Sequence, residues 1–205
     1  MINYKMIADK LILMDKTIWI GSSAVRKENG FTDLIKGLNP KPTGVVEIGT
    51  FRGLATLVLA SVAKKVYTFD VIYQESAEEI WEIFGVRDKI EYVIIDAHKK
   101  GYDPELVKTA EPHEAINKYI DHAKANAGIK KYLEDHDVQA NTVFIDGQHK
   151  HREAKADHEI TKQYGRTIFH DVAWNYPGIE KLMKEIGAKI INEFGYWQDK
   201  SKPGK

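Results

Sequence analysis

Acidic side chains follow the short apolar runs of this chain, where they are placed to bind a ligand. These runs end, in chain order, in Glu47, Asp70, Asp96, Asp146 and the pair His170-Asp171. The carboxyl ends of parallel strands border the ligand crevice of an open α/β sheet, so five such ends predict one polar binding rim. For each acid taken alone, capping of the next turn is an equal alternative.

The stretch GVVEIGTFRG, residues 44–53, predicts a cofactor loop between a strand and a helix. Gly49 and Gly53 allow a ligand to approach the backbone, and a helix beginning just after them offers free N–H groups and a positive dipole end. Glu47 would repel a pyrophosphate but suits an ammonium or a sulfonium. We therefore expect S-adenosylmethionine rather than NAD, held by Glu47, Gly49, Thr50 and Gly53.

Asp70 ends the second run, 23 residues after Glu47, where a carboxylate accepts both ribose hydroxyls. NAD enzymes use an acid at a similar distance, so this feature does not discriminate between the two cofactors. The cofactor contacts that we predict beyond the loop are Asp70 and Val71 at the ribose, Asp96 and Ala97 at the adenine, and Asp146.

A second cluster is predicted from VFIDGQHKHREAKADHEI and TIFHDVAWNYPGIEKLMKE. Two carboxylates with an imidazole or water suit a hard divalent cation such as magnesium, and the predicted ligands are Asp146, His170 and Asp171. A cation there would hold a substrate hydroxyl and lower its pKa. His149 would then remove the proton as a general base, since imidazole titrates near neutrality.

Structural roles compete with each of these assignments. His149 is also consistent with a solvated residue at a helix start, with Asp146 capping the turn, and His170 with a histidine hydrogen-bonded inside the fold. Asp157 and His158 lie within an amphipathic helical pattern, and we interpret both as structural.

The elements that must position these residues alternate between strand and helix. Helical patterns such as LATLVLASVA and GIEKLMKEIG separate the apolar runs, which indicates a parallel sheet covered on both faces by right-handed crossovers. The predicted strands are residues 44–49, 64–70, 90–96, 141–147, 166–172 and 188–194.

Residues 98–138 form an insertion between the third and fourth predicted strands. Ile116, Tyr119, Ile120 and Ala123 recur at helical spacing and predict an amphipathic helix. A helix packed on the sheet edge and a lid over the substrate are equal alternatives.

Composition narrows the class of protein. A chain of 205 residues fits one domain, residues 1–205, and its 30 basic and 30 acidic residues give no bulk charge for nucleic acid. The chain has no cysteine, no signal-peptide pattern and no apolar run long enough to cross a bilayer. We expect a cytoplasmic protein.

The segments GVVEIGTFRGLATLVLA and YTFDV resemble the first two motifs of class I S-adenosylmethionine-dependent methyltransferases, in the branch that reads EIGT-x-x-G. The resemblance implies a Rossmann-like α/β fold, with a mostly parallel seven-stranded sheet, helices on both faces and an antiparallel last strand. It also implies that the glycine loop contacts the methionine part and that Asp70 holds the ribose.

IDG-x-H followed by FHD is similar to metal-dependent sugar and small-molecule O-methyltransferases. This resemblance implies magnesium ligands at Asp146 and Asp171, a base at His149 and a small-molecule hydroxyl acceptor. His170 stands where relatives have another ligand, such as Glu. A non-catalytic cofactor-binding scaffold is the main alternative, a nicotinamide oxidoreductase is disfavoured by Glu47, and a homo-oligomer is left open.

Overall fold

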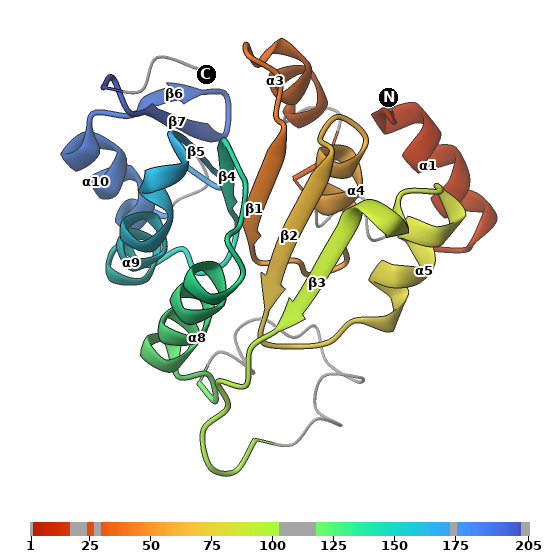
Figure 1. The fold of residues 1–205 in the computed structure, drawn as a ribbon. Helices are drawn as coiled ribbons and strands as arrows, with labels where there is room; N and C mark the ends of the chain where they lie inside the picture. Colours follow the sequence, from red (N-terminus) through yellow and green to blue (C-terminus); the bar gives the residue numbers. More distant parts are fainter. Residues whose placement is uncertain (1, 17–23, 27–29, 103–117, 173–175, 202–205) are drawn as a thin grey trace.

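The computed structural model describes residues 2–16, 24–26, 30–102, 118–172 and 176–201, and they build a seven-stranded sheet of order β3-β2-β1-β4-β5-β7-β6 (Figure 1). Strands β1 to β5 are parallel, and β7 is antiparallel to β5 and β6. The predicted α/β fold and antiparallel last strand are therefore confirmed. The strands are β1 (Gly44–Ile48), β2 (Lys65–Asp70), β3 (Ile90–Ile94), β4 (Thr142–Ile145), β5 (Arg166–Phe169), β6 (Lys189–Ile191) and β7 (Phe194–Gln198).

The predicted strand at residues 188–194 is wrong in one respect, because the chain reverses within it. Asn192 adopts a left-handed φ of 54° between β6 and β7, and asparagine tolerates this conformation better than most residues. β6 becomes the exposed sheet edge, whereas β7 buries Phe194 and pairs with β5. The apolar run is thus a hairpin, which supplies the seventh strand.

Helices cover both faces of the sheet, as alternation of buried side chains along β1 requires. Val45 packs with the first group of helices and Val46 with the second. The first group is α1 (Tyr4–Leu13), α3 (Phe31–Gly37), α4 (Leu54–Ala60) and α5 (Glu75–Ile83), and the second is α8 (His122–Asp135), α9 (His151–Thr161) and α10 (Pro177–Ile186) (Figure 1). Two 3-10 turns, η2 (Arg87–Lys89) and η3 (Lys162–Tyr164), precede β3 and β5.

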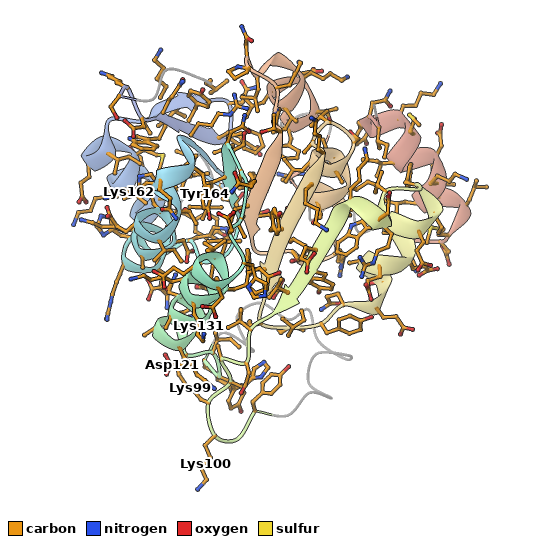
Figure 2. The ribbon with its side chains drawn as sticks, in the orientation of Figure 1. Lys99, Lys100, Asp121, Lys131, Lys162 and Tyr164 are labelled. Carbon is orange, nitrogen blue, oxygen red and sulfur yellow. The ribbon has the colours of Figure 1, made fainter. Side chains whose placement is uncertain are left out.

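The helix predicted in the 98–138 segment begins later than expected. Asp121, labelled at the start of α8 in Figure 2, accepts a hydrogen bond from the Lys124 backbone N–H at 3.1 Å and caps the helix. Ile120 instead forms an isolated antiparallel bridge with His98, so it and Tyr119 lie outside the helix, and Ile116 lies outside the described residues. The buried stripe of α8 is Ala125, Ile129 and Leu133.

Helix α8 is the crossover between β3 and β4, and it packs on α9 and on the sheet. These contacts are those of a packed helix, and the lid alternative stays a prediction. Within the described ranges, no helix combines the length and apolar content that crossing a bilayer requires.

Candidate active site

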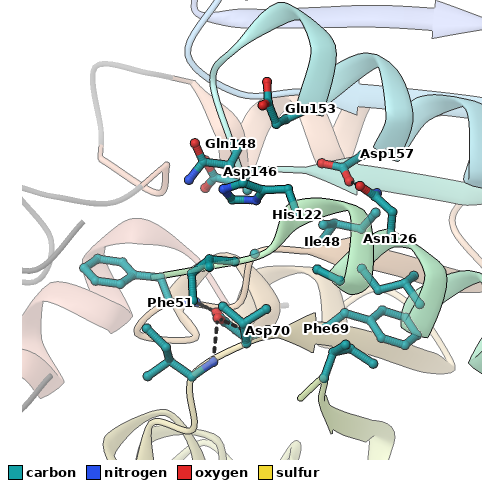
Figure 3. A pocket seen from close by; sticks show the side chains of 18 of the residues that line it. Ile48, Phe51, Phe69, Asp70, His122, Asn126, Asp146, Gln148, Glu153 and Asp157 are labelled. Carbon is teal, nitrogen blue, oxygen red and sulfur yellow. Dashed lines mark hydrogen bonds between the residues drawn. The ribbon is translucent and has the colours of Figure 1, made fainter. Parts of the chain in front are cut away.

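A cavity opens at the carboxyl ends of the central strands, where the sequence predicts the ligand crevice. Its walls come from the loop after β1, the end of β2, the loop after β4, and the helices α8 and α9 (Figure 3). Of the predicted cofactor residues, those that line it are Gly49, Asp70, Val71 and Asp146.

The glycine loop packs so tightly that side chains would not fit. Gly49 has φ +94°, and a Cβ there would lie 2.4 Å from the carbonyl oxygen of Asp146. Gly53 has φ +72°, and a Cβ would meet Nε1 of Trp81 at 2.7 Å. Thr50 is buried, with its hydroxyl 2.6 Å from that of Thr68, and it does not line the cavity. Glycine here therefore allows close packing of the loop on β4 and α5.

Asp70 lies at the predicted place but already binds the glycine loop. Its Oδ2 accepts the backbone N–H groups of Thr50 at 3.0 Å and Phe51 at 2.9 Å. Its Oδ1 accepts those of Val71 at 2.7 Å and Ile72 at 3.1 Å. Burial raises the pKa of Asp70, and these four bonds oppose the rise. The backbone N–H groups of Thr50 and Phe51 in the glycine loop thus donate to a carboxylate of the protein itself.

Glu47 lies inside the fold rather than in the cavity wall. It is 0% exposed, and its Oε2 accepts a hydrogen bond of 2.5 Å from the Thr56 hydroxyl. Burial raises the pKa of Glu47 to about 8, so near neutral pH the side chain is mostly protonated. A buried neutral carboxyl group does not attract a ligand cation, so the structure does not support this reason for preferring S-adenosylmethionine.

The predicted adenine contacts, Asp96 and Ala97, do not reach the cavity. β3 ends at Ile94, two residues before Asp96, whose side chain is 85% exposed and lies 3.3 Å from Nζ of Lys124. Ala97 is buried, and its carbonyl oxygen accepts a hydrogen bond from the Asp121 backbone. Ile95 lines the cavity in their place.

The second predicted cluster is brought together at the ends of β4 and β5. Nε2 of His149 lies 3.1 Å from Oδ2 of Asp171 and 3.8 Å from Oδ1 of Asp146. Single ligand atoms of Asp146, His149 and Asp171 all lie within 4.8 Å of one another, which suits a metal ion. Tyr176 covers one side, with its ring centroid 4.4 Å from that of His149.

His170 has a different position from the one expected of a metal ligand. Its Nδ1 bonds Oδ1 of Asp146 at 2.7 Å, its ring stacks on Phe194, and it is 7% exposed. The group of ligand atoms that fits an ion therefore contains His149 in place of His170. His170 instead orients Asp146, in line with its alternative role inside the fold.

Charge is concentrated in this cluster. Burial alone would raise the pKa of Asp146, but the neighbouring His170 and His149 hold it well below its ordinary value. Burial alone would lower the pKa of His170, and Asp146 raises it above the ordinary value. Burial raises the pKa of Asp171, which also adopts a left-handed φ of 58°, a conformation that is costly for a non-glycine residue. The fold thus holds the Asp146–His170 pair beside a partly buried carboxylate whose backbone is left-handed.

Comparison with known proteins identifies the family. A family model described as a methyltransferase domain matches residues 46–172, which is more than half of the chain. The chain belongs to this methyltransferase family. The predicted class I S-adenosylmethionine-dependent methyltransferase is therefore confirmed. No curated protein matches the sequence of the chain.

Solved structures similar to this methyltransferase share its fold at low sequence identity. An O-methyltransferase from Bacillus cereus in complex with S-adenosylhomocysteine has a TM-score of 0.55 and 16% identity, covering 88% of this chain and 78% of its own. An O-methyltransferase of tomaymycin synthesis from Streptomyces achromogenes, in complex with S-adenosylmethionine, has a TM-score of 0.51 and 12% identity, with coverage of 85% and 78%. A methyltransferase from Podospora anserina bound to S-adenosylhomocysteine has a TM-score of 0.50 and 11% identity, with coverage of 97% and 98%.

Sequence reasoning missed the part of the methyltransferase cavity that helices α8 and α9 supply. The polar lining residues there and in the loop before α9 are His122, Asn126, Gln148, Glu153 and Asp157 (Figure 3). We interpreted Asp157 as structural, yet it faces this cavity. A signal was present, because Asp157 lies in the buried stripe of α9 with Ala154 and Thr161, where a carboxylate is unusual.

Proposed function

We propose that this methyltransferase transfers the methyl group of S-adenosylmethionine to a hydroxyl oxygen of a small molecule, with assistance from a divalent cation. One observation carries the proposal: Asp146 belongs both to the cavity wall and to the cluster with His149 and Asp171. A donor in the cavity would therefore present its methyl group next to groups that can manage the acceptor proton.

The residues of the cavity fit the cofactor. Gly49 lines the cavity at a position where a Cβ would collide with the backbone of Asp146, just after β4. Asp70 faces the same cavity, and a ribose diol there would share or displace the loop amides that now fill its roughly four acceptor sites. When bound, S-adenosylmethionine supplies an electrophilic methyl group, and the protein's part is to align it with the acceptor oxygen.

The cluster fits a hard cation, because two carboxylates and one imidazole offer the oxygen-rich set that magnesium or manganese accepts. Asp146, His149 and Asp171 would hold it. Such an ion lowers the pKa of a bound hydroxyl. The sequence-based set with His170 as third ligand is replaced by this one.

A metal-free route is the second candidate, and one distance favours it. Nε2 of His149 lies 3.1 Å from Oδ2 of Asp171, close enough for the carboxylate to stabilise the imidazolium formed when His149 takes the acceptor proton. In this route Asp171 positions the base, and Asp146 is held by His170.

The acceptor is proposed as a sugar or another hydroxyl compound, in keeping with the small-molecule O-methyltransferases that the IDG-x-H and FHD motifs resemble. The cytoplasm remains the proposed compartment, and a chain without cysteine is compatible with its reducing conditions.

Titration calorimetry with S-adenosylhomocysteine and with Mg²⁺ tests the proposal without knowledge of the acceptor. We expect the wild type to bind both, and Asp171→Asn to keep S-adenosylhomocysteine while losing Mg²⁺ affinity at least about tenfold. Asp135→Asn, at an exposed position of α8, is the matched control. Absence of S-adenosylhomocysteine binding would refute the donor, and absence of Mg²⁺ binding would leave the metal-free route.

A further inference from the structure

Part of the cavity is lined by strand ends on one side and by α8 on the other, and we call the space between them the slot. Ile48, Phe69 and Ile95 line it from the strand ends, and Ala125 and Ile129 line it from the helix. A slot with apolar walls on both sides suits a flat aromatic ring better than a sugar or a charged amino acid.

A polar pair, Asp157 and Asn126, also lines the cavity. Figure 3 shows the two side chains together on the α8 and α9 side, apart from Asp70. Nδ2 of Asn126 donates a hydrogen bond of 2.5 Å to Oδ1 of Asp157 and so joins the two helices. The residue Asp157 is 6% exposed, so its carboxylate is almost removed from water.

The second carboxylate oxygen of Asp157, Oδ2, can accept a further hydrogen bond. Oδ2 lies 3.7 Å from the position that a Cβ of Gly147 would take, next to the end of β4, and no described residue donates a hydrogen bond to it. Burial raises the pKa of Asp157 to about 7. Asp70, by contrast, is satisfied by four backbone amides. A buried carboxylate oxygen facing a cavity is stabilised by a ligand that brings an N–H group.

We propose that Asp157, oriented by Asn126, recognises the 6-amino group of the adenine of the methyl donor and so makes the enzyme selective for a 6-aminopurine over a 6-oxopurine. The amino N–H would donate to Oδ2 while the ring lies in the apolar slot. This inference rests on the proposed function and assigns the base contact to α9, in place of the exposed Asp96. A 6-oxo group would instead place an acceptor against an acceptor.

The test is calorimetry of two ligands, S-adenosylhomocysteine and its 6-oxo counterpart S-inosylhomocysteine, against wild type and Asp157→Asn. We expect the wild type to prefer the adenine ligand by about 10- to 100-fold. In Asp157→Asn the side-chain oxygen can still accept from Asn126, which leaves an NH₂ group facing the slot. The adenine ligand should then bind about tenfold more weakly and the 6-oxo ligand more tightly, so that the preference narrows or reverses.

The control is Glu159→Gln, an exposed position on the same helix, which should keep the wild-type preference. If Asp157→Asn weakens both ligands equally, or if the wild type does not discriminate between them, the inference is overturned. A wild type that binds neither ligand refutes the proposed function itself, which is a distinguishable result. If thermal melting shows that Asp157→Asn is unfolded, Asn126→Ala takes its place and should reduce the same preference.

Discussion

The two acidic regions of the binding rim differ in how their side chains are satisfied. At the glycine loop, Asp70 accepts four backbone N–H groups. At the ends of β4 and β5, Nε2 of His149 and Nε2 of His170 are buried without a hydrogen-bond partner among the described residues, beside a carboxylate in a left-handed conformation.

The glycine-loop region therefore has a structural role, whereas the groups at the ends of β4 and β5 take part in the chemistry that we propose. A saturated carboxylate fixes the loop and contributes mainly to stability. Buried ring nitrogens without a hydrogen-bond partner cost stability, and so does a left-handed backbone at a non-glycine residue. Both are kept where binding of a substrate, a proton or an ion compensates for the cost. Substitutions in the two regions should therefore affect different measurements.

The largest expected effect is on catalysis, in the second region. His149→Gln should lower the rate of methyl transfer from labelled S-adenosylmethionine to a hydroxyl acceptor by about 10²- to 10⁴-fold, because a general base or metal ligand is lost. Its urea midpoint should change less than that of Asp70→Asn, since Nε2 of His149 is buried without a hydrogen-bond partner among the described residues. His136→Gln, at an exposed position after α8, is the control. Full activity of His149→Gln would rule out His149 both as a metal ligand and as the general base.

The next effect is on stability, in the first region. Asp70→Asn should reduce the free energy of unfolding by about 2–5 kcal/mol, because an amide presents an NH₂ group to two of the four backbone donors. Urea unfolding followed by circular dichroism measures the change. Asp9→Asn, at an exposed position of α1, should stay within about 0.5 kcal/mol of the wild type. Equal stabilities of Asp70→Asn and the wild type would contradict the saturated-carboxylate interpretation.

The smallest effect is a pH dependence from Glu47. Its folded pKa is raised from 4.5 to about 8, so between these values the folded state holds a proton that the unfolded state has released. The stability contribution of this carboxyl group is thus complete below about pH 4.5 and is lost as the pH rises through about 8. Glu47→Gln should flatten this part of the stability curve, measured by urea unfolding between pH 5 and 9. A wild-type curve parallel to that of Glu47→Gln would exclude a raised pKa, and Glu82→Gln, at an exposed position, is the control.

Most helices and strands could be predicted from the sequence. The spacing of apolar residues and the positions of glycines are properties of short segments, and they can be recognised without the tertiary structure. The parallel strands, the helices α4, α9 and α10, and the acids Asp70, Asp146 and Asp171 lie where the pattern indicates. The wrong predictions lie where one local sequence pattern is compatible with two different structures. Asn192 turns one apolar run into a hairpin, and Asp121 starts α8 later than the apolar spacing suggests.

The amino-acid sequence by itself determined the fold class, the tight loop between Gly49 and Gly53, and the position of Asp70 and Asp146 at the carboxyl ends of neighbouring strands. Each of these follows from backbone conformation and from the two periods of buried side chains. Only the tertiary structure decided where each acidic side chain points, because this depends on residues that are far away in the sequence. Contacts across the sheet and between helices bury Glu47 against Thr56, leave Asp96 in solvent beside Lys124, and turn Asp157 into the cavity beside Asn126.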